Sequence, residues 1–599
     1  MIENNFNELE KCLLFKKYYF NNKYFILGML VSFLVVSCDK DFLEYEPEGV
    51  LSNENVATAE NAEALVVAAY AGIANDDMIG PLTQMWVYGS VRSDDAYKGG
   101  GGRGDVDIVD KYEQYNLTAA DNGTDWMGPR TWTNYYAAIS RANFALSVIN
   151  EIPDADYADK TLRQAELRFL RAHSHFILKQ LFKKVPYITE ELTQEEIGQV
   201  SNDLSNDDLW NTIAADFQFA FDNLPQAQDQ VGRADKNAAA AYLAKLRLYQ
   251  AYEQSETHQV TSINTSRLEE VITFADAVTG SLEPDYANNY LDGFDNGPES
   301  IWAAQFSIND GTVVSRVSFV TGLNSPHGTG LYGCCGFHLA SQNMVNAFKT
   351  DATGLPLLDT FNDEDIFNTV EEDGTSIPAA GLTIDPRIDH TVGLPGRPYK
   401  YRNTVNEAGD MIYNFSWARD PGVYGYFGNM KEQQAPDCSC YVKEGPFVGT
   451  SKNVDFIRYG DVLLFKAEAL IQLDRWDEAL PIINQIRMRA AASGQRPIDA
   501  GASDIYNVGT YDAFPDKAFA LKALKFERRL EFGMEGPRFF DLVRWGEAAD
   551  VLNAYLTVER TKRDFLANAQ FTAGRDEYYP IPQREIDFTG GLYIQNPGY

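Results

Sequence analysis

The amino-acid sequence predicts an all-α fold, a scaffold of tetratricopeptide-like helix hairpins that carries a loop-rich ligand-binding face. Apolar residues recur at three- and four-residue spacing in many segments, which is typical of amphipathic helices. Two of these segments are separated by only two residues, which forces an antiparallel pair. A long central region rich in glycine, proline, asparagine and aromatic residues shows little periodicity and is predicted to form loops.

The N-terminal half contains most of the predicted helices. The first begins near Asn55, where apolar residues from Ala62 to Tyr70 are spaced so that they lie on one face. Further helices are predicted over residues 135–149, 160–181, 207–223, 237–252 and 267–278.

The C-terminal half contains a second helical zone. Helices are predicted over residues 454–473 and 476–490, with only Asp474 and Arg475 between them. Apolar residues at helical spacing belong to the core by default, so we assign none of them to ligand contact. Small and large residues here occupy the places that a tetratricopeptide unit requires: Ala467, Leu470, Leu473, Trp476, Ala479 and Leu480.

Two regions of the sequence are predicted to form loops. Periodicity is absent between Met78 and Trp132, and residues 94–102 are predicted to be loop because a glycine run follows two aspartates. The second region spans residues 282–451 and is interrupted by one predicted helix over 341–349. Binding residues concentrate on loops that a rigid scaffold positions, so we expect the ligand face here.

Composition and motifs exclude several classes of function. A formal net charge of −35 disfavours nucleic acid as a partner, because phosphate backbones are bound by clustered Lys and Arg. The only long apolar run lies near the N-terminus, which excludes a polytopic membrane protein. We find no nucleophile elbow, no HExxH motif and no phosphate loop. We therefore expect no enzyme, no cofactor and no metal site; a surface glycoside hydrolase with two catalytic carboxylates is the weaker alternative.

The first residues are typical of a bacterial lipoprotein signal. Three lysines precede an apolar run over residues 24–36, and Ser37 and Cys38 follow it. The run is too short for a comfortable transmembrane helix. We predict a signal peptide over residues 1–37, acylation of Cys38, and a tether over residues 38–54.

Several separated blocks resemble one family, the SusD/RagB outer-membrane nutrient-binding lipoproteins of Bacteroidetes. The N-terminal half contributes AELRFLRA at residues 165–172, and the C-terminal half contributes FIRYGDVLL at 456–464. The most specific block is ERRLEF at 527–532 followed by GPRFFDLVRWG at 536–546. The chain ends with YPIP at 579–582 and QNPGY at 595–599, which are also similar to the family.

The resemblance implies an all-α body with an N-terminal helical part over residues 55–280 and a C-terminal part over 281–599, the latter with a loop-rich insertion over 282–451. It also implies a lipid-anchored protein of the cell outer membrane that is exposed at the surface. Such a protein captures oligo- or polysaccharide and delivers it to a SusC-like TonB-dependent transporter. RagB-like relatives take peptides, so peptide capture is the alternative.

Recognition of sugars needs flat apolar platforms and planar polar groups on loops. Three loop clusters supply them, and the resemblance places ligand contacts on the first two. An acidic solvated loop, or arginines paired with neighbouring carboxylates, would explain the first and third clusters without a ligand. The candidate ligand-binding residues are Asp94, Asp95, Tyr97 and Trp126 in the first cluster, Cys334, Cys335 and Phe337 in the second, and Arg387, Arg397, Tyr399 and Trp417 in the third.

Mixed charges near residues 527–544 have the usual pattern of ion pairs that brace helices from inside. We interpret this cluster as structural. Its members are Arg528, Arg529, Arg538, Arg544, Glu527, Glu531, Glu535 and Asp541.

Four cysteines remain after removal of the signal peptide and acylation of Cys38, and they allow three pairings. Disulfides are favoured over zinc, because neither the adjacent pair Cys334 and Cys335 nor Cys438 and Cys440 fits the spacing of a zinc hairpin. A bridge within the adjacent pair would be a flat platform, whereas cross-pairing would join two binding loops. Both arrangements stay open at this point.

Overall fold

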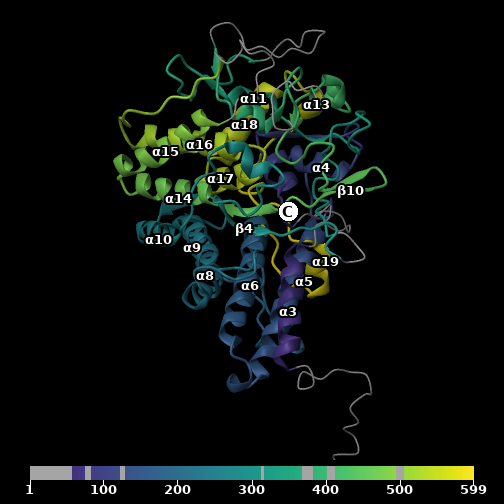
Figure 1. Ribbon diagram of the computed structural model, residues 1–599, viewed down its shortest axis with the longest axis vertical. Helices are drawn as coiled ribbons and strands as arrows, with labels where there is room; N and C mark the ends of the chain where they lie inside the picture. Colours follow the sequence, from purple (N-terminus) through teal and green to yellow (C-terminus); the bar gives the residue numbers. More distant parts are fainter. Residues whose placement is uncertain are drawn as a thin grey trace, which may run out of the picture. The chain divides into compact units, whose positions relative to one another are not determined.

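Six helices of the N-terminal half pack as successive neighbours (Figure 1). The computed structural model describes residues 57–74, 78, 82–121, 128–311, 316–366, 382–400, 412–493 and 505–599. Each of these helices contacts the next long helix along the chain, as the hairpin prediction requires. They are α3 (Ala59–Ile73), α5 (Gly128–Glu151), α6 (Lys160–Phe182), α8 (Asn206–Asn223), α9 (Lys236–Ala251) and α10 (Thr265–Ala277).

Local sequence signals set where several of these helices begin. Side-chain oxygens of Thr58, Ser205, Asp235 and Asn264 accept hydrogen bonds from backbone N–H groups of the first turn, which otherwise lack partners. The apolar face predicted for the first helix is the face that α3 buries. The predicted all-α scaffold is confirmed.

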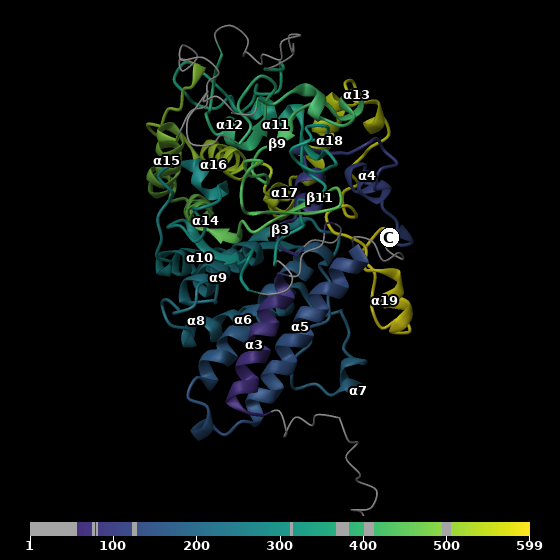
Figure 2. The same cartoon turned by 45° about the vertical axis from the view of Figure 1, so that its right-hand side comes forward.

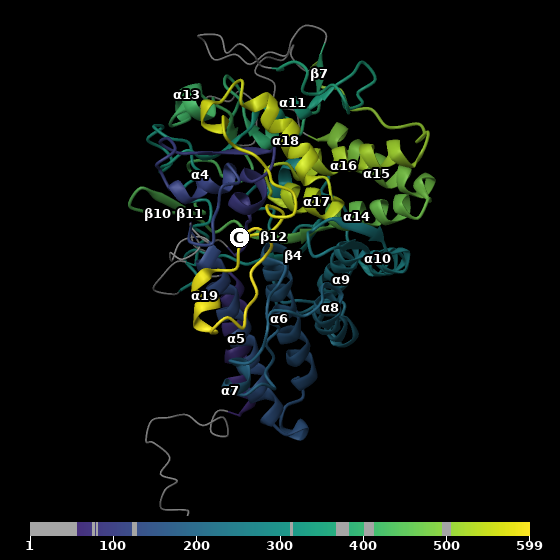
Figure 3. The ribbon, with the colours of Figure 1, turned by 180° about the vertical axis from the view of Figure 1, so that it is seen from behind.

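The C-terminal helices form a second group that joins the first through α14 (Figures 2 and 3). Helix α14 (Tyr459–Gln472) packs on α15 (Trp476–Ala492) and α16 (Lys517–Phe532), and also on α9 and α10. The chain continues through α17 (Pro537–Trp545), α18 (Ala548–Glu559) and α19 (Gln583–Phe588). Residues 57–599 form one compact unit with a main hydrophobic core that both groups of helices share.

The start of the predicted helix over 454–473 was wrong. Residues Val454–Arg458 form strand β12, which pairs antiparallel with β4 (Ser300–Ala304). A strand partner about 150 residues away satisfies the backbone groups of this segment, and such tertiary pairing overrides a weak local helix preference.

The region between residues 78 and 132 is more ordered than its lack of periodicity predicts. It contains a buried π-helical turn η2 (Trp86–Val91), strand β1 (Ala96–Gly99) and helix α4 (Asp107–Glu113). The loop predicted over 94–102 is corrected at β1, because this strand pairs with β5 (Phe337–Ala340), a partner that local sequence cannot reveal. The helix predicted over 341–349 is confirmed as α11 (Gln342–Ala347).

The remaining described elements are short and lie mostly in the loop-rich parts. None of the described helices is both long enough and apolar enough to cross a membrane. The short helices are α7 (Gln194–Ile197), α12 (Ile388–Thr391) and α13 (Pro421–Tyr424), with single turns η4 (Asp154–Asp156), η5 (Tyr286–Tyr290), η6 (Phe415–Trp417) and η8 (Asp564–Leu566). The short strands pair antiparallel as β2 (Tyr252–Gln254) with β3 (Val260–Ile263), β6 (Lys349–Thr350) with β7 (Thr383–Ile384), β8 (Val392–Gly393) with β9 (Gly428–Asn429), and β10 (Tyr441–Glu444) with β11 (Phe447–Thr450).

Buried ion pairs brace the C-terminal helices, as the charge pattern predicts. The Glu531 carboxylate accepts hydrogen bonds from Arg458, Arg387 and Arg489, and all four side chains are buried. Nearby, Arg528 pairs with Asp541 and Arg544 pairs with Glu468. Buried charges of this kind are tolerated only when each one has a partner.

Candidate ligand-binding site

Strands β1 and β5 bring the first two predicted clusters together. Gly99 stands opposite Phe337 in this pair, and the Gly100 N–H donates to the Gly336 carbonyl oxygen over 2.8 Å. Gly100 has a φ of +78°, and a Cβ there would lie 2.5 Å from the Phe337 ring. Only glycine permits this close approach.

The C-terminal residues of the third cluster, near Trp417, contact the loops of the first two clusters. The His327 N–H donates to the Trp417 carbonyl oxygen over 2.9 Å, and the Arg419 guanidinium pairs with Asp105 at 2.7 Å. A Cβ on Gly336 would lie 3.2 Å from the Cβ of Arg419. Three loops therefore meet, and we name residues 99–105, 325–337 and 412–420 the loop junction.

The loop junction presents apolar surface to solvent. Phe415 is 40% exposed, Leu331 is 48% exposed and Ile412 is 42% exposed. Trp417 is half-buried and packs edge-on against the rings of Tyr399 and Tyr413. Exposed large apolar side chains gathered on loops are typical of a binding surface, and aromatic rings held by a packed layer offer rigid platforms.

A disulfide between Cys334 and Cys335 belongs to the same surface. Cys334 is half-buried, and its N–H donates to the Pro446 carbonyl oxygen over 2.8 Å. The Cys335 N–H donates to the Leu323 carbonyl oxygen over 2.9 Å. Of the two arrangements left open by the sequence, the structure has the adjacent bridge, held by backbone hydrogen bonds on both sides.

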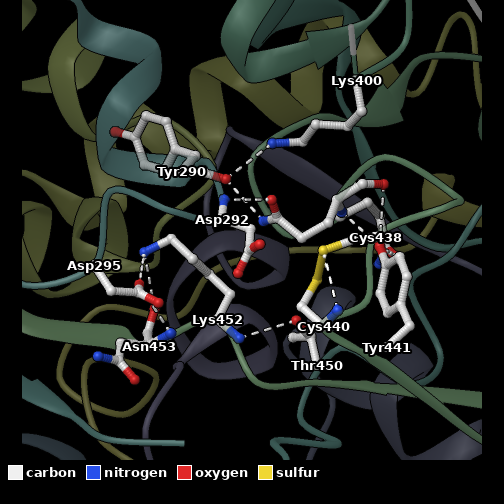
Figure 4. Close-up of a disulfide and its surroundings, with 12 residues drawn as sticks. Tyr290, Asp292, Asp295, Lys400, Cys438, Cys440, Tyr441, Thr450, Lys452 and Asn453 are labelled. Atoms are coloured by element: carbon white, nitrogen blue, oxygen red, sulfur yellow. Dashed lines mark hydrogen bonds and ion pairs between the residues drawn. A yellow bond between two sulfur atoms is a disulfide. The ribbon is translucent and has the colours of Figure 1, made fainter. Parts of the chain in front are cut away.

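The second disulfide joins Cys438 and Cys440 beside Asp292 (Figure 4). One carboxylate oxygen and the two sulfur atoms lie within 4.8 Å of one another, a spacing that suits a metal ion. The sulfurs are bonded to each other, however, whereas a metal is held by thiolates. The disulfide therefore closes a short loop and does not form a metal site. Beside it, the Lys452 ammonium pairs with the Asp295 carboxylate at 2.5 Å (Figure 4).

The first cluster is corrected because its polar side chains are buried. Asp94 is 2% exposed and accepts two hydrogen bonds from Arg538, at 2.8 and 3.0 Å. The fully buried Asp95 pairs with Arg529 at 3.0 Å. Tyr97 is also buried, and its hydroxyl donates to a carboxylate oxygen of Glu559 over 2.6 Å. These three residues brace the fold and are closed to a ligand.

The predicted arginines of the third cluster are corrected for the same reason. Arg387 has no exposed surface and pairs with Asp385 and Glu531. Arg397, which is 5% exposed, pairs with Asp389 at 2.7 Å. Their partner carboxylates are internal, so both arginines match the structural explanation weighed from the sequence.

Two predicted aromatic residues support the platform from beneath. Tyr399 is fully buried, and its hydroxyl donates to the Asn429 carbonyl oxygen over 2.8 Å. Phe337 is 1% exposed and packs against Trp86. Their predicted roles as ligand contacts are corrected to packing roles.

Cys334, Cys335 and Trp417 stay predictions as ligand contacts, and Trp126 and Cys38 lie outside the described residues. The sequence reasoning missed Leu331, Phe415 and Arg419. The one signal that could have found Phe415 is its place two residues before Trp417 in a loop.

Asp94→Asn is expected to reduce the acid sensitivity of the fold. Burial alone would raise the pKa of the Asp94 carboxyl, but Arg529 and Arg538 lower it to about 2, from an ordinary value of 3.8. A lowered pKa stabilises the fold above 3.8, and this stability is lost as the pH falls toward 2. On acidification the unmodified protein is expected to lose on the order of 2 kcal/mol of its free energy of unfolding through Asp94, and the variant is expected to lack this loss.

Urea unfolding at a series of pH values from neutral to acidic measures this effect. Asp154→Asn is the matched control, because Asp154 forms an exposed ion pair with Lys160. An unchanged pH dependence in Asp94→Asn would contradict the assigned role of the buried carboxylate.

Two family models match the chain, one in its N-terminal half and one in its C-terminal half. Residues 298–599 match the model described as "SusD family", and residues 41–248 match the model described as "Starch-binding associating with outer membrane". The chain belongs to the SusD family. The resemblance stated from the sequence is therefore confirmed.

Curated relatives of this SusD family member cover most of its length. A SusD-like protein of Formosa agariphila is 26% identical over 540 residues, which are 88% of this chain and 91% of the relative. A SusD-like protein of Bacteroides ovatus is 24% identical over 535 residues, which are 86% of this chain and 80% of the relative.

Solved structures share the fold. A SusD superfamily protein of Bacteroides vulgatus has a TM-score of 0.64 and 20% identity, and the match covers 90% of this chain and 99% of that one. A laminarin-binding SusD-like protein has a TM-score of 0.61 and 22% identity, with 90% and 100% covered. Surface glycan-binding protein A from Bacteroides thetaiotaomicron, in complex with laminarihexaose, has a TM-score of 0.55 and 19% identity, with 90% and 99% covered.

Proposed function

We propose that this protein is a surface lipoprotein that captures a glycan at the loop junction and delivers it to a SusC-like TonB-dependent transporter. Cys38 is the proposed site of the lipid anchor. The boundary near residue 280 between an N-terminal and a C-terminal part of the helical body stays a prediction. Capture, and not hydrolysis, is the proposed activity, since the sequence contains no recognisable catalytic motif.

The observation that carries this proposal is the meeting of three loops at one exposed apolar surface. Phe415 and Trp417 offer ring faces for the C–H face of a sugar, and the Cys334–Cys335 disulfide lies on an adjoining loop. His327, Arg419 and Asp420 are polar side chains of the same junction that suit hydroxyl groups. Flat apolar faces beside polar groups are what carbohydrate recognition requires.

The named ligands of related proteins indicate which class of glycan to test first. One protein with this fold is named as laminarin-binding and another as a complex with laminarihexaose, which supports a glucan as the first glycan to test. The net charge of −35 makes a densely anionic glycan the less favourable ligand.

Affinity electrophoresis of the protein lacking residues 1–38 tests the proposal. Gels that contain one soluble polysaccharide each, laminarin among them, are expected to retard the protein with at least one glycan and without hydrolysis. Phe415→Ala is expected to lose this retardation. Phe588→Ala is the matched control, because Phe588 lies on α19 outside the loop junction and is 88% exposed. Retardation by no glycan would overturn glycan capture in favour of peptide capture.

A further inference from the structure

A cavity of about 180 Å³ lies among the helices, and no residue of the loop junction lines it. Its wall includes parts of α6, α9, α16 and α17, strand β12, and the segment 82–86 at the start of η2. The turn η5 and the segments 318–321, 431–434 and 450–453 complete much of the rest. A space of this volume holds about six water molecules, which is close to the size of one sugar ring.

Aromatic rings and side-chain amides make up much of the cavity wall. Aromatic faces suit the C–H face of a sugar, and amides both donate to and accept from hydroxyl groups. The aromatic side chains include Tyr249, Tyr290, Phe456 and Phe540, and the amides include Gln84, Gln180, Asn289 and Gln434. The buried Oε1 atom of Gln84 has no hydrogen-bond partner among the described residues.

Two charged groups of the wall have no ion-pair partner among the described residues. The Lys245 ammonium lies over the rings of Phe176 and Tyr242, at 5.3 and 5.7 Å from their centroids, with no carboxylate in ion-pair contact. The Asp455 carboxylate accepts a hydrogen bond from Ser300 and has no cation in ion-pair contact. Burial lowers the pKa of Lys245 and raises the pKa of Asp455 to about 6.

Other charged groups of the wall are already paired inside the protein. Lys431 pairs with Glu535 at 2.7 Å, and Arg528 pairs with Asp461 at 3.2 Å. The two groups left over, Lys245 and Asp455, have opposite signs. Together these two groups add no net charge that would select an anion or a cation, and with the Gln84 amide oxygen they offer a donor and acceptors to a neutral ligand with hydroxyl groups.

We propose that this cavity is a second ligand site that holds one neutral sugar ring, with Lys245 and Asp455 bound to its hydroxyl groups. The inference rests on the proposed capture of carbohydrate, but it concerns a site separate from the loop junction. Lys245 donates, Asp455 accepts or donates according to its protonation, and the aromatic rings of the wall contact the C–H groups of the sugar.

Titration of the protein lacking residues 1–38 with free monosaccharides tests this site. The probes are glucose, galactose, mannose, N-acetylglucosamine and glucuronate, followed by calorimetry and by saturation-transfer NMR. Saturable binding of at least one neutral sugar is expected, and Lys245→Met is expected to weaken it at least tenfold while the methylene stem stays packed. Asp455→Asn keeps the shape of the side chain and serves as the second variant if Lys245→Met does not fold.

Phe415→Ala separates the two sites. This variant is expected to lose retardation by polysaccharide and to keep monosaccharide binding, so that failure of the cavity site and failure of the loop junction give different results. No saturable binding of any neutral monosaccharide, binding unchanged in both cavity variants, or a preference for glucuronate would each overturn the inference.

Discussion

Glu531→Gln is expected to lower the free energy of unfolding by about 3–5 kcal/mol. Burial would raise the pKa of Glu531, but three buried arginines hold it well below its usual range. The amide keeps the shape of the side chain and removes the negative charge that compensates those arginines. Chemical denaturation at neutral pH, followed by circular dichroism, measures the change.

Glu478→Gln is the control for this prediction. Glu478 pairs with Arg475 at the exposed N-terminal end of α15, where solvent screens the charges, so no measurable change is expected. Glu299 also pairs with Arg458 and Arg489. Equal stability of Glu531→Gln and the unmodified protein would show that Glu299 and the remaining carboxylates suffice to balance the arginines.

Trp417→Ala is expected to weaken glycan binding by about 10- to 100-fold, or about 1.4–2.8 kcal/mol. Trp417 is the half-buried aromatic residue that joins the loop junction to the layer of Tyr399 and Tyr413 beneath it. Its loss removes a ring face and the packing that fixes the platform. Calorimetric titration with the glycan that retards the protein in gels measures the affinity.

Trp417→Phe distinguishes stacking from folding. A phenyl ring keeps a flat face and part of the packing, so binding is expected to fall between that of the unmodified protein and that of Trp417→Ala. Circular dichroism is expected to be the same for all three proteins. Full affinity in Trp417→Ala would place the glycan on another surface.

The helical scaffold could be predicted closely because its signal is local. The helix predicted over residues 160–181 is α6 (Lys160–Phe182), since the spacing of its apolar residues lies within the segment itself. The first residues of the helix predicted over 454–473 were wrong because the partner of β12 is a strand about 150 residues earlier in the sequence.

The candidate site was predicted at the level of loops and not of side chains. The three clusters do meet, but residue type alone does not tell whether a charged side chain faces solvent or an internal partner. Asp94 is bound by Arg538, which is 444 positions away, and Arg387 is bound by Glu531, 144 positions away. Apolar residues such as Phe415 were missed because exposure of a single aromatic residue in a loop leaves no periodic trace.

The pairing of β1 with β5 has a consequence for the order of folding. It joins segments more than 230 residues apart, and the Arg538 contact to Asp94 spans most of the chain. Contacts of such high sequence separation form late, because the entropy cost of closing a long loop comes before the stabilisation from the contact. The segment that leads into β1 is held by Arg538, so the loop junction is not expected to be fixed in place before the C-terminal part of the chain has folded. Neither half of the chain is therefore expected to bind ligand when it is expressed alone.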